Sequence, residues 1–98
     1  MRTVIETPTF EKLADKIWSE DERLYFIKWI SLNPLAGDVI LGADGARKVR
    51  WSTKNQGKRG SVRMIYFNVS AQGVIYLITL YQKSDKENIS TNEILKKV

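Results

Sequence analysis

Residues 61–82, SVRMIYFNVSAQGVIYLITLYQ, contain two apolar runs on either side of a short polar turn. Both runs are rich in β-branched and aromatic side chains, which favour β-strands. The four residues between them, SAQG at 70–73, have the composition of a tight hairpin turn. This stretch therefore predicts two neighbouring antiparallel strands, over residues 61–69 and 74–82.

A third strand is predicted just before this hairpin, over residues 46–52. Side chains alternate across a strand, so Val49 and Trp51 are expected on one face and Lys48 and Arg50 on the other. A basic, glycine-containing loop over residues 53–60 connects this strand to the next one. The pattern thus predicts two cations on one side of a rigid sheet.

Two helices are predicted in the N-terminal part of the chain. The first begins at Thr7, whose hydroxyl suits an N-cap and is followed by proline, and it ends near Trp18. Its apolar residues recur with helical spacing at Phe10, Leu13, Ala14 and Ile17. The second helix begins at the capping box of Ser19 and Glu22 and stops at the Asn-Pro pair of residues 33–34.

The remaining elements complete an α+β fold. A short strand is expected over residues 2–6, and we interpret residues 33–45, with one proline and three glycines, as the connection from the helices to the sheet. A second capping box, Ser90 with Glu93, opens a short C-terminal helix. The order β-α-α-β-β-β-α predicts one small domain over residues 1–98, with two helices packed on one face of a curved, mostly antiparallel sheet.

The composition removes several classes of chemistry. The chain has no cysteine and no histidine, which excludes disulfides, thiolate nucleophiles and the most common general base. There is no glycine-rich phosphate loop, and Asp38 and Asp44 fit turns better than metal ligands, so no cofactor and no metal are expected. No apolar run reaches the roughly 20 residues of a membrane span. Residues 1–8 have no signal-peptide core, so we expect a soluble cytoplasmic protein.

Positive charge is concentrated in one block of the chain. The net charge is +5, but residues 1–45 carry −3, residues 46–83 carry +8 with no acid, and residues 84–98 are neutral. A long cationic block is typical of a protein that binds a polyanion, most often nucleic acid. The alternative is a solubilising surface, although such surfaces usually intersperse both signs.

Four cations are candidates for a common site. Lys48 and Arg50 share a strand face, and Lys83 closes the last strand on the same side as Tyr81. Arg63 lies within an apolar strand, so it is either a phosphate-binding residue or a strand-end residue that reaches water. Lys48 and Arg50 fit a solvent-facing strand edge as well as a binding site. The strand order predicts that all four cations converge on one sheet face.

Several segments together resemble the HigB-like branch of the RelE toxin superfamily. They are residues 45–50 (GARKVR), 57–60 (GKRG), 63–67 (RMIYF) and 76–83 (YLITLYQK), and residues 6–10 (ETPTF) and 33–40 (NPLAGDVI) fit the same branch. The match covers nearly the whole chain, and the order and spacing of the segments are more specific than any single motif. The family fold has the element order predicted above.

The resemblance implies an endoribonuclease toxin that enters the ribosomal A site and cleaves the codon there. It also implies a cognate antitoxin, which in this branch is usually a helix-turn-helix DNA-binding protein. The pair represses its own operon, so operator DNA would be bound only through the antitoxin.

The resemblance also assigns residues. Lys48 and Arg50 match the paired basic residues of the first central strand, Arg63 matches the arginine that opens the next strand, and Lys83 matches a basic residue after the last strand. Many relatives carry a catalytic tyrosine near the C-terminal segment, where this chain has Ile89. Tyr81 is the candidate to replace that tyrosine. Further RNA contacts are expected from Arg47, Lys54, Lys58, Arg59 and Tyr81.

These residues suit metal-independent cleavage by the 2′-hydroxyl of the RNA. Arg63 is expected to bind the phosphate oxygens as a fixed, charged fork. Neighbouring cations favour the neutral form of a lysine, so Lys48 beside Arg50 is our hypothesis for the general base. Lys83 or Arg50 would bind phosphate or protonate the leaving group.

Two alternative functions stay open at this point. A ParE-like toxin would keep the fold and inhibit DNA gyrase, although the basic strands argue against it. A module that binds RNA or the ribosome without cutting would have the same composition as the nuclease.

Overall fold

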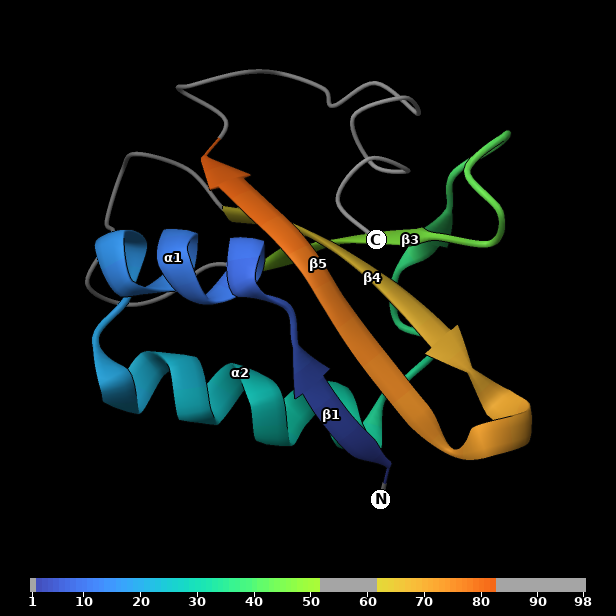
Figure 1. The fold of residues 1–98 in the computed structure, drawn as a ribbon, viewed down its shortest axis with the longest axis horizontal. Coiled ribbons are helices and arrows are strands. Elements are labelled where there is room, and N and C mark those ends of the chain that lie inside the picture. Colours follow the sequence, from blue (N-terminus) through green and yellow to red (C-terminus); the bar gives the residue numbers. More distant parts are fainter. Residues whose placement is uncertain (1, 52–61, 83–98) are drawn as a thin grey trace.

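The computed structural model describes residues 2–51 and 62–82 and shows a five-stranded sheet with two helices (Figure 1). In chain order the elements are β1 (Thr3–Glu6), α1 (Pro8–Ile17), α2 (Glu20–Leu32), β2 (Asp38–Val39), β3 (Arg47–Trp51), β4 (Val62–Val69) and β5 (Val74–Gln82). The predicted α+β class is confirmed, as is the order of the predicted elements up to β5. The predicted C-terminal helix and the loop over residues 53–60 lie outside the described residues.

Both helices begin at their predicted caps. Thr7 Oγ1 accepts a hydrogen bond from the Phe10 amide at 3.3 Å, and proline occupies the first helical position. At α2, Ser19 Oγ accepts from the Glu22 amide and Glu22 Oε1 accepts from the Ser19 amide. These bonds satisfy amides that a helix end leaves without an intrahelical partner, so the local sequence determines both boundaries.

Arg23 connects α2 to α1 and β1. Its Nε donates to Glu6 Oε1 at 2.6 Å, and its Nη1 donates to Asp15 Oδ1 at 2.5 Å. The hydrogen bond to Glu6 is the main reason that the pKa of Arg23 is raised, and burial opposes it in part. The guanidinium therefore bridges the end of β1 to both helices as a permanent cation.

The strand order of the sheet is β1-β5-β4-β3-β2, and only β1 runs parallel to its neighbour. β4 and β5 form the predicted hairpin, which closes through a 3₁₀ turn over Ser70–Gln72 and Gly73 at a φ of 66°. β2 was not predicted. It has two residues inside the 33–45 connection, which is too short for the alternation of a strand to be recognised.

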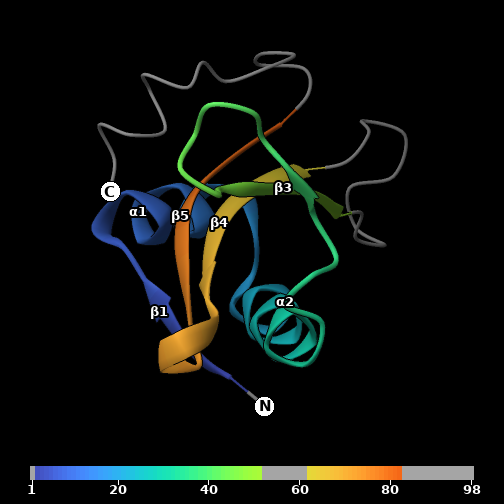
Figure 2. The same ribbon diagram turned by 90° about the vertical axis from the view of Figure 1, so that its right-hand side faces the viewer.

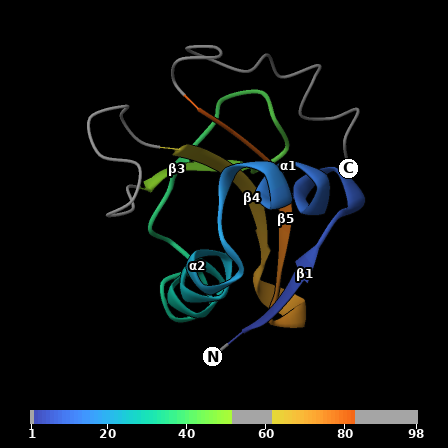
Figure 3. The ribbon, with the colours of Figure 1, turned by 90° about the vertical axis from the view of Figure 1, so that its left-hand side faces the viewer.

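The main core lies between the helices and one face of the sheet (Figure 3). Apolar side chains of α1 and α2 meet those of β3, β4 and β5 there. Val49 and Trp51 both belong to this layer, as the alternation of β3 predicted. Its fully buried members include Phe10, Phe26, Ile30, Met64, Tyr66 and Leu77.

The side of the sheet turned away from α1 and α2, called the distal face below, carries a second and smaller core. Its buried members are Ala43, Ala46, Ile65, Ile78 and Tyr81, so the loop over residues 40–46 packs against this face (Figure 2).

β5 contains one extra residue within this region. Ile65 pairs with Thr79 and Tyr66 pairs with Leu77, which leaves Ile78 as a β-bulge. A bulge shifts the alternation of side chains by one residue. Beyond it, Tyr81 faces the distal side of the sheet.

Candidate functional site

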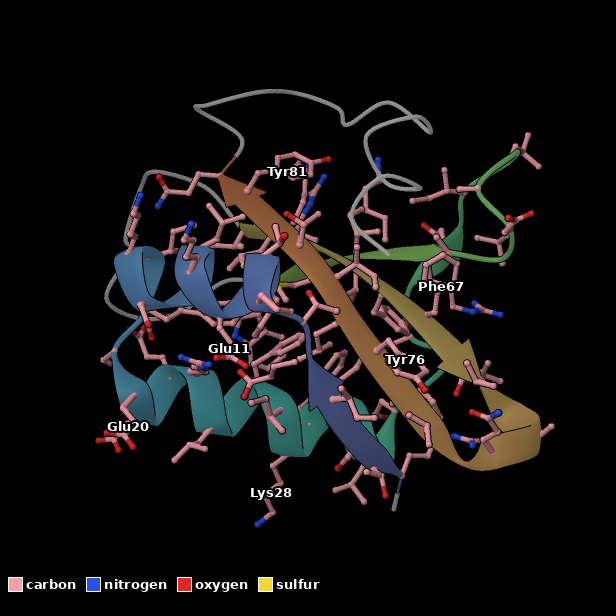
Figure 4. The ribbon with its side chains drawn as sticks, viewed as in Figure 1. Glu11, Glu20, Lys28, Phe67, Tyr76 and Tyr81 are labelled. Atoms are coloured by element: carbon pink, nitrogen blue, oxygen red, sulfur yellow. The ribbon has the colours of Figure 1, made fainter. Side chains whose placement is uncertain are left out.

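Three of the predicted site residues form a row across the distal face. In the strand register Arg50 lies opposite Arg63, and Arg63 lies opposite Tyr81, near the end of β5 (Figure 4). Paired residues of antiparallel strands point to the same side, with Cβ atoms about 4.5–5.5 Å apart. Lys48 is two residues from Arg50 on β3 and therefore occupies the next row of the same face. The register thus brings together the three described cations that were predicted to converge.

These four side chains differ in their access to solvent. Arg50 is exposed and Lys48 is half-buried, whereas Arg63 is 8% exposed and Tyr81 is 6% exposed. Arg63 therefore does not fit the interpretation of a strand-end arginine that reaches water. Two accessible cations lie beside a guanidinium at the floor of the row, which is an arrangement suited to hold an anion such as a phosphate.

An acid from outside the basic block also reaches this face. Asp38 of β2 pairs with Lys48 of β3, so its side chain points to the same side of the sheet. The sequence placed Asp38 in a turn and showed no acid between residues 46 and 83. Only the register of β2 against β3 reveals this neighbour, and it limits the positive patch at the β2 edge.

Arg47 lies on the opposite side of β3 from Lys48. Its Nη1 donates to the Gly37 carbonyl at 2.6 Å. The buried Tyr66, its register partner, donates through its hydroxyl to the Pro34 carbonyl and accepts from the Gly37 amide, at 2.9 Å each. Burial raises the pKa of Tyr66, and the Gly37 hydrogen bond and the Arg47 charge offset this only in part, so the hydroxyl keeps its proton. The only sign of this arrangement in the sequence was the hydroxyl of Tyr66 within an otherwise apolar strand.

An apolar groove of about 800 Å³ lies further along the same hairpin. Its apolar lining includes Phe67 and Tyr76, which are cross-strand partners on β4 and β5 (Figure 4). Its charged lining residues are Glu6 and Asp44, and none of the described residues that line it is basic. The groove is therefore chemically distinct from the row of cations.

The other predicted site residues, Lys54, Lys58, Arg59 and Lys83, lie outside the described residues. Within residues 2–51 and 62–82, no three acidic side chains come close enough to hold a metal ion. Neither of the two helices in these ranges is long and apolar enough to cross a membrane.

Comparisons with known proteins bear on the fold. No protein-family model matches the sequence. Among solved structures, the chain is similar to the E. coli toxin RelE, in a variant with two arginines replaced by alanine and in the free state. The TM-score is 0.62, the match covers 98% of this chain and 92% of that chain, and the sequence identity is 11%. The RelE-like fold that the resemblance implied is therefore confirmed.

Proposed function

We propose that this chain is the toxin of a toxin–antitoxin pair and that it cuts messenger RNA in the ribosomal A site. The observation that carries the proposal is the row of Arg50 and Arg63 beside Lys48 on the distal face. The fold shared with the E. coli toxin RelE supports it, and so does the concentration of positive charge in residues 46–83. A phosphate backbone is the ligand that such a group of cations fits.

In this reaction the RNA supplies its own nucleophile. The 2′-oxygen attacks the adjacent phosphorus, and the bond from phosphorus to the 5′-oxygen breaks. The products are a 2′,3′-cyclic phosphate and a free 5′-hydroxyl. The enzyme has to accept the 2′ proton, stabilise charge on the phosphate oxygens and supply a proton to the 5′-oxygen. Side chains of lysine, arginine and tyrosine can perform each of these steps.

Each step is assigned to a residue of the site. Lys48 accepts the 2′ proton as general base, and Arg63 binds the non-bridging phosphate oxygens with its planar fork. Arg50 binds the phosphate or protonates the leaving oxygen, and Lys83 is the second candidate for that step. Tyr81, next to Arg63 in the register, is the alternative base.

The proposal includes several partners. The ribosome orders the message, because so few groups cannot both hold and cut free RNA well. A helix-turn-helix antitoxin masks the basic face and carries the binding of operator DNA. A ribosomal target implies a cytoplasmic location. Further RNA contacts come from Lys54, Lys58 and Arg59. Arg47, expected to be one of these contacts, lies on the opposite side of β3 from Lys48 and binds the Gly37 carbonyl, so it is not assigned to the RNA.

The test is to map new 5′ ends on a defined message in a purified translation reaction, with and without ribosomes. Lys48→Ala removes the proposed base. Lys28→Ala is a matched control, because Lys28 is an exposed lysine of α2 that points away from Tyr81 (Figure 4). We expect ribosome-dependent ends inside A-site codons, reduced by about 10²–10⁴-fold in Lys48→Ala and unchanged in Lys28→Ala.

Other outcomes would change the assignment. Equal cutting by the wild type and Lys48→Ala would remove Lys48 from the role of base. Cutting of free RNA would keep the nuclease and remove the ribosome from the mechanism. An intact message alongside halted growth in cells would favour gyrase inhibition or a ribosome-binding module without catalysis.

A further inference from the structure

We propose that Tyr66 is a positioning residue for Lys48 and that it acts through the segment of residues 34–39. Tyr66 belongs to the main core, on the other side of the sheet from Lys48, so it does not touch the proposed substrate. Where the inference concerns cutting, it rests on the function proposed above. Where it concerns the position of the segment, it stands on the contacts alone.

The first of these contacts is the Tyr66 hydroxyl. The side chain is fully buried, and the hydroxyl donates to the Pro34 carbonyl and accepts from the Gly37 amide at 2.9 Å each. A phenylalanine would fill the same space, but it would leave the Gly37 amide and the Pro34 carbonyl without this partner. Both partners belong to one short segment, so the hydroxyl attaches that segment to the sheet.

The second contact is the close approach of Gly37 to β3. A Cβ atom at Gly37 would lie 2.8 Å from the carbonyl oxygen of Lys48 and 3.0 Å from Cε1 of Tyr66. Arg47 binds the Gly37 carbonyl from the residue next to Lys48. The Gly37 backbone therefore rests on the peptide of Lys48, with its amide and its carbonyl each held by a side chain.

These contacts determine what lies beside Lys48. Directly after Gly37 the chain becomes β2, where Asp38 pairs with Lys48. A strand of two residues is marginal without support, so the contacts of Tyr66 and Arg47 hold it in place. Without the hydroxyl, the segment can move away from β3 and the peptide of Lys48 loses a fixed neighbour. A displacement of about 1 Å near a reacting group can lower the rate about 10²-fold.

The experiment compares Tyr66→Phe with Tyr76→Phe. Tyr76 is a half-buried tyrosine of the same sheet whose hydroxyl makes no hydrogen bond among the described residues, so its variant is a matched control. Hydrogen exchange of the Gly37 amide, followed by NMR, reports on the segment without any RNA. Single-turnover cutting on ribosomes over a range of protein concentrations gives the maximal rate and the half-saturating concentration separately.

In Tyr66→Phe we expect the Gly37 amide to exchange at least about tenfold faster. The maximal cutting rate should fall by about 10–100-fold, while the half-saturating concentration changes less than about twofold. Tyr76→Phe should match the wild type in all three quantities. A general loss of stability would not separate the two kinetic constants in this way.

Gly37→Ala provides a second variant, because it keeps the hydroxyl but forces the segment away from the Lys48 carbonyl. It should lower the maximal rate as Tyr66→Phe does. A wild-type maximal rate in a folded Tyr66→Phe, or a change in half-saturation alone, would overturn the proposal. Failure of both variants to fold would also overturn the proposal. It would show that the segment of residues 34–39 is needed for the stability of the whole fold and has no separate role in positioning Lys48. If the wild type does not cut, the proposed function fails, whereas Gly37 exchange still tests the attachment.

Discussion

Replacing Thr7 by valine tests how the start of α1 is joined to the bulged strand. The Thr7 hydroxyl accepts from the Phe10 amide at 3.3 Å and donates to the carbonyls of Leu77 and Ile78 at 2.8 Å and 3.0 Å. Valine has nearly the same shape but can neither accept nor donate. The substitution therefore removes the helix cap and the link to β5 together.

The expected magnitude follows from these two losses. Losing an N-cap lowers the free energy of unfolding by about 1 kcal/mol. Losing a hydrogen bond to a half-buried carbonyl lowers it by about another 1 kcal/mol. The Leu77 carbonyl keeps its hydrogen bond from the Thr7 amide at 3.1 Å. Only the hydrogen bond from the Thr7 hydroxyl to the Ile78 carbonyl is therefore counted as the second loss. A total of about 2 kcal/mol corresponds to a drop in Tm of about 8–16 °C for a domain of this size.

The assay is urea unfolding followed by circular dichroism, with Thr9→Val as the control. Thr9 lies in the same helix, and its hydroxyl makes no hydrogen bond among the described residues. We expect Thr9→Val to remain within about 0.5 kcal/mol of the wild type. If the two variants lowered the free energy of unfolding equally, the assignment of Thr7 as both cap and link would be wrong.

Two further predictions concern pH and the site. Because burial raises the pKa of Tyr66 in the folded state, the unfolded chain ionises first above about pH 10, so the free energy of unfolding should fall as the pH rises through that range. Tyr66→Phe should show a shallower fall in urea titrations between about pH 8 and about pH 11, and equal slopes would contradict the burial argument. Arg63→Lys keeps the charge but loses the planar fork, so single-turnover cutting should fall by about 10²-fold, and an unchanged rate would show that only charge is required.

The helices and the hairpin could be predicted because their signals are local. The cap at Thr7 and the capping box at Ser19 act within four residues, and the structure confirms both. The strands over residues 62–69 and 74–82 carry enough β-branched and aromatic side chains to be recognised alone. β2 is held in place by contacts with distant residues, so its own two residues gave no signal.

The candidate site was predicted only in part, because its geometry depends on register. The alternation of β3 was sufficient to separate Lys48 from Val49. The pairing of Asp38 with Lys48 comes from a segment ten residues earlier in the chain. The hydrogen bond from Arg47 to the Gly37 carbonyl likewise joins two segments that are distant in the chain. From the sequence alone, Arg47 could not be distinguished from the other cations of residues 46–83.

The bulge at Ile78 decides which side chains of the last part of β5 face the distal side of the sheet. If Ile78 paired with Ile65 and the strand had no bulge, Leu80 would lie opposite Arg63 and Tyr81 would turn into the helical layer. One sequence of β5 could then present different chemistry on the same face, according to whether one residue is left out of the ladder. A position-by-position comparison of sequences would not detect that difference.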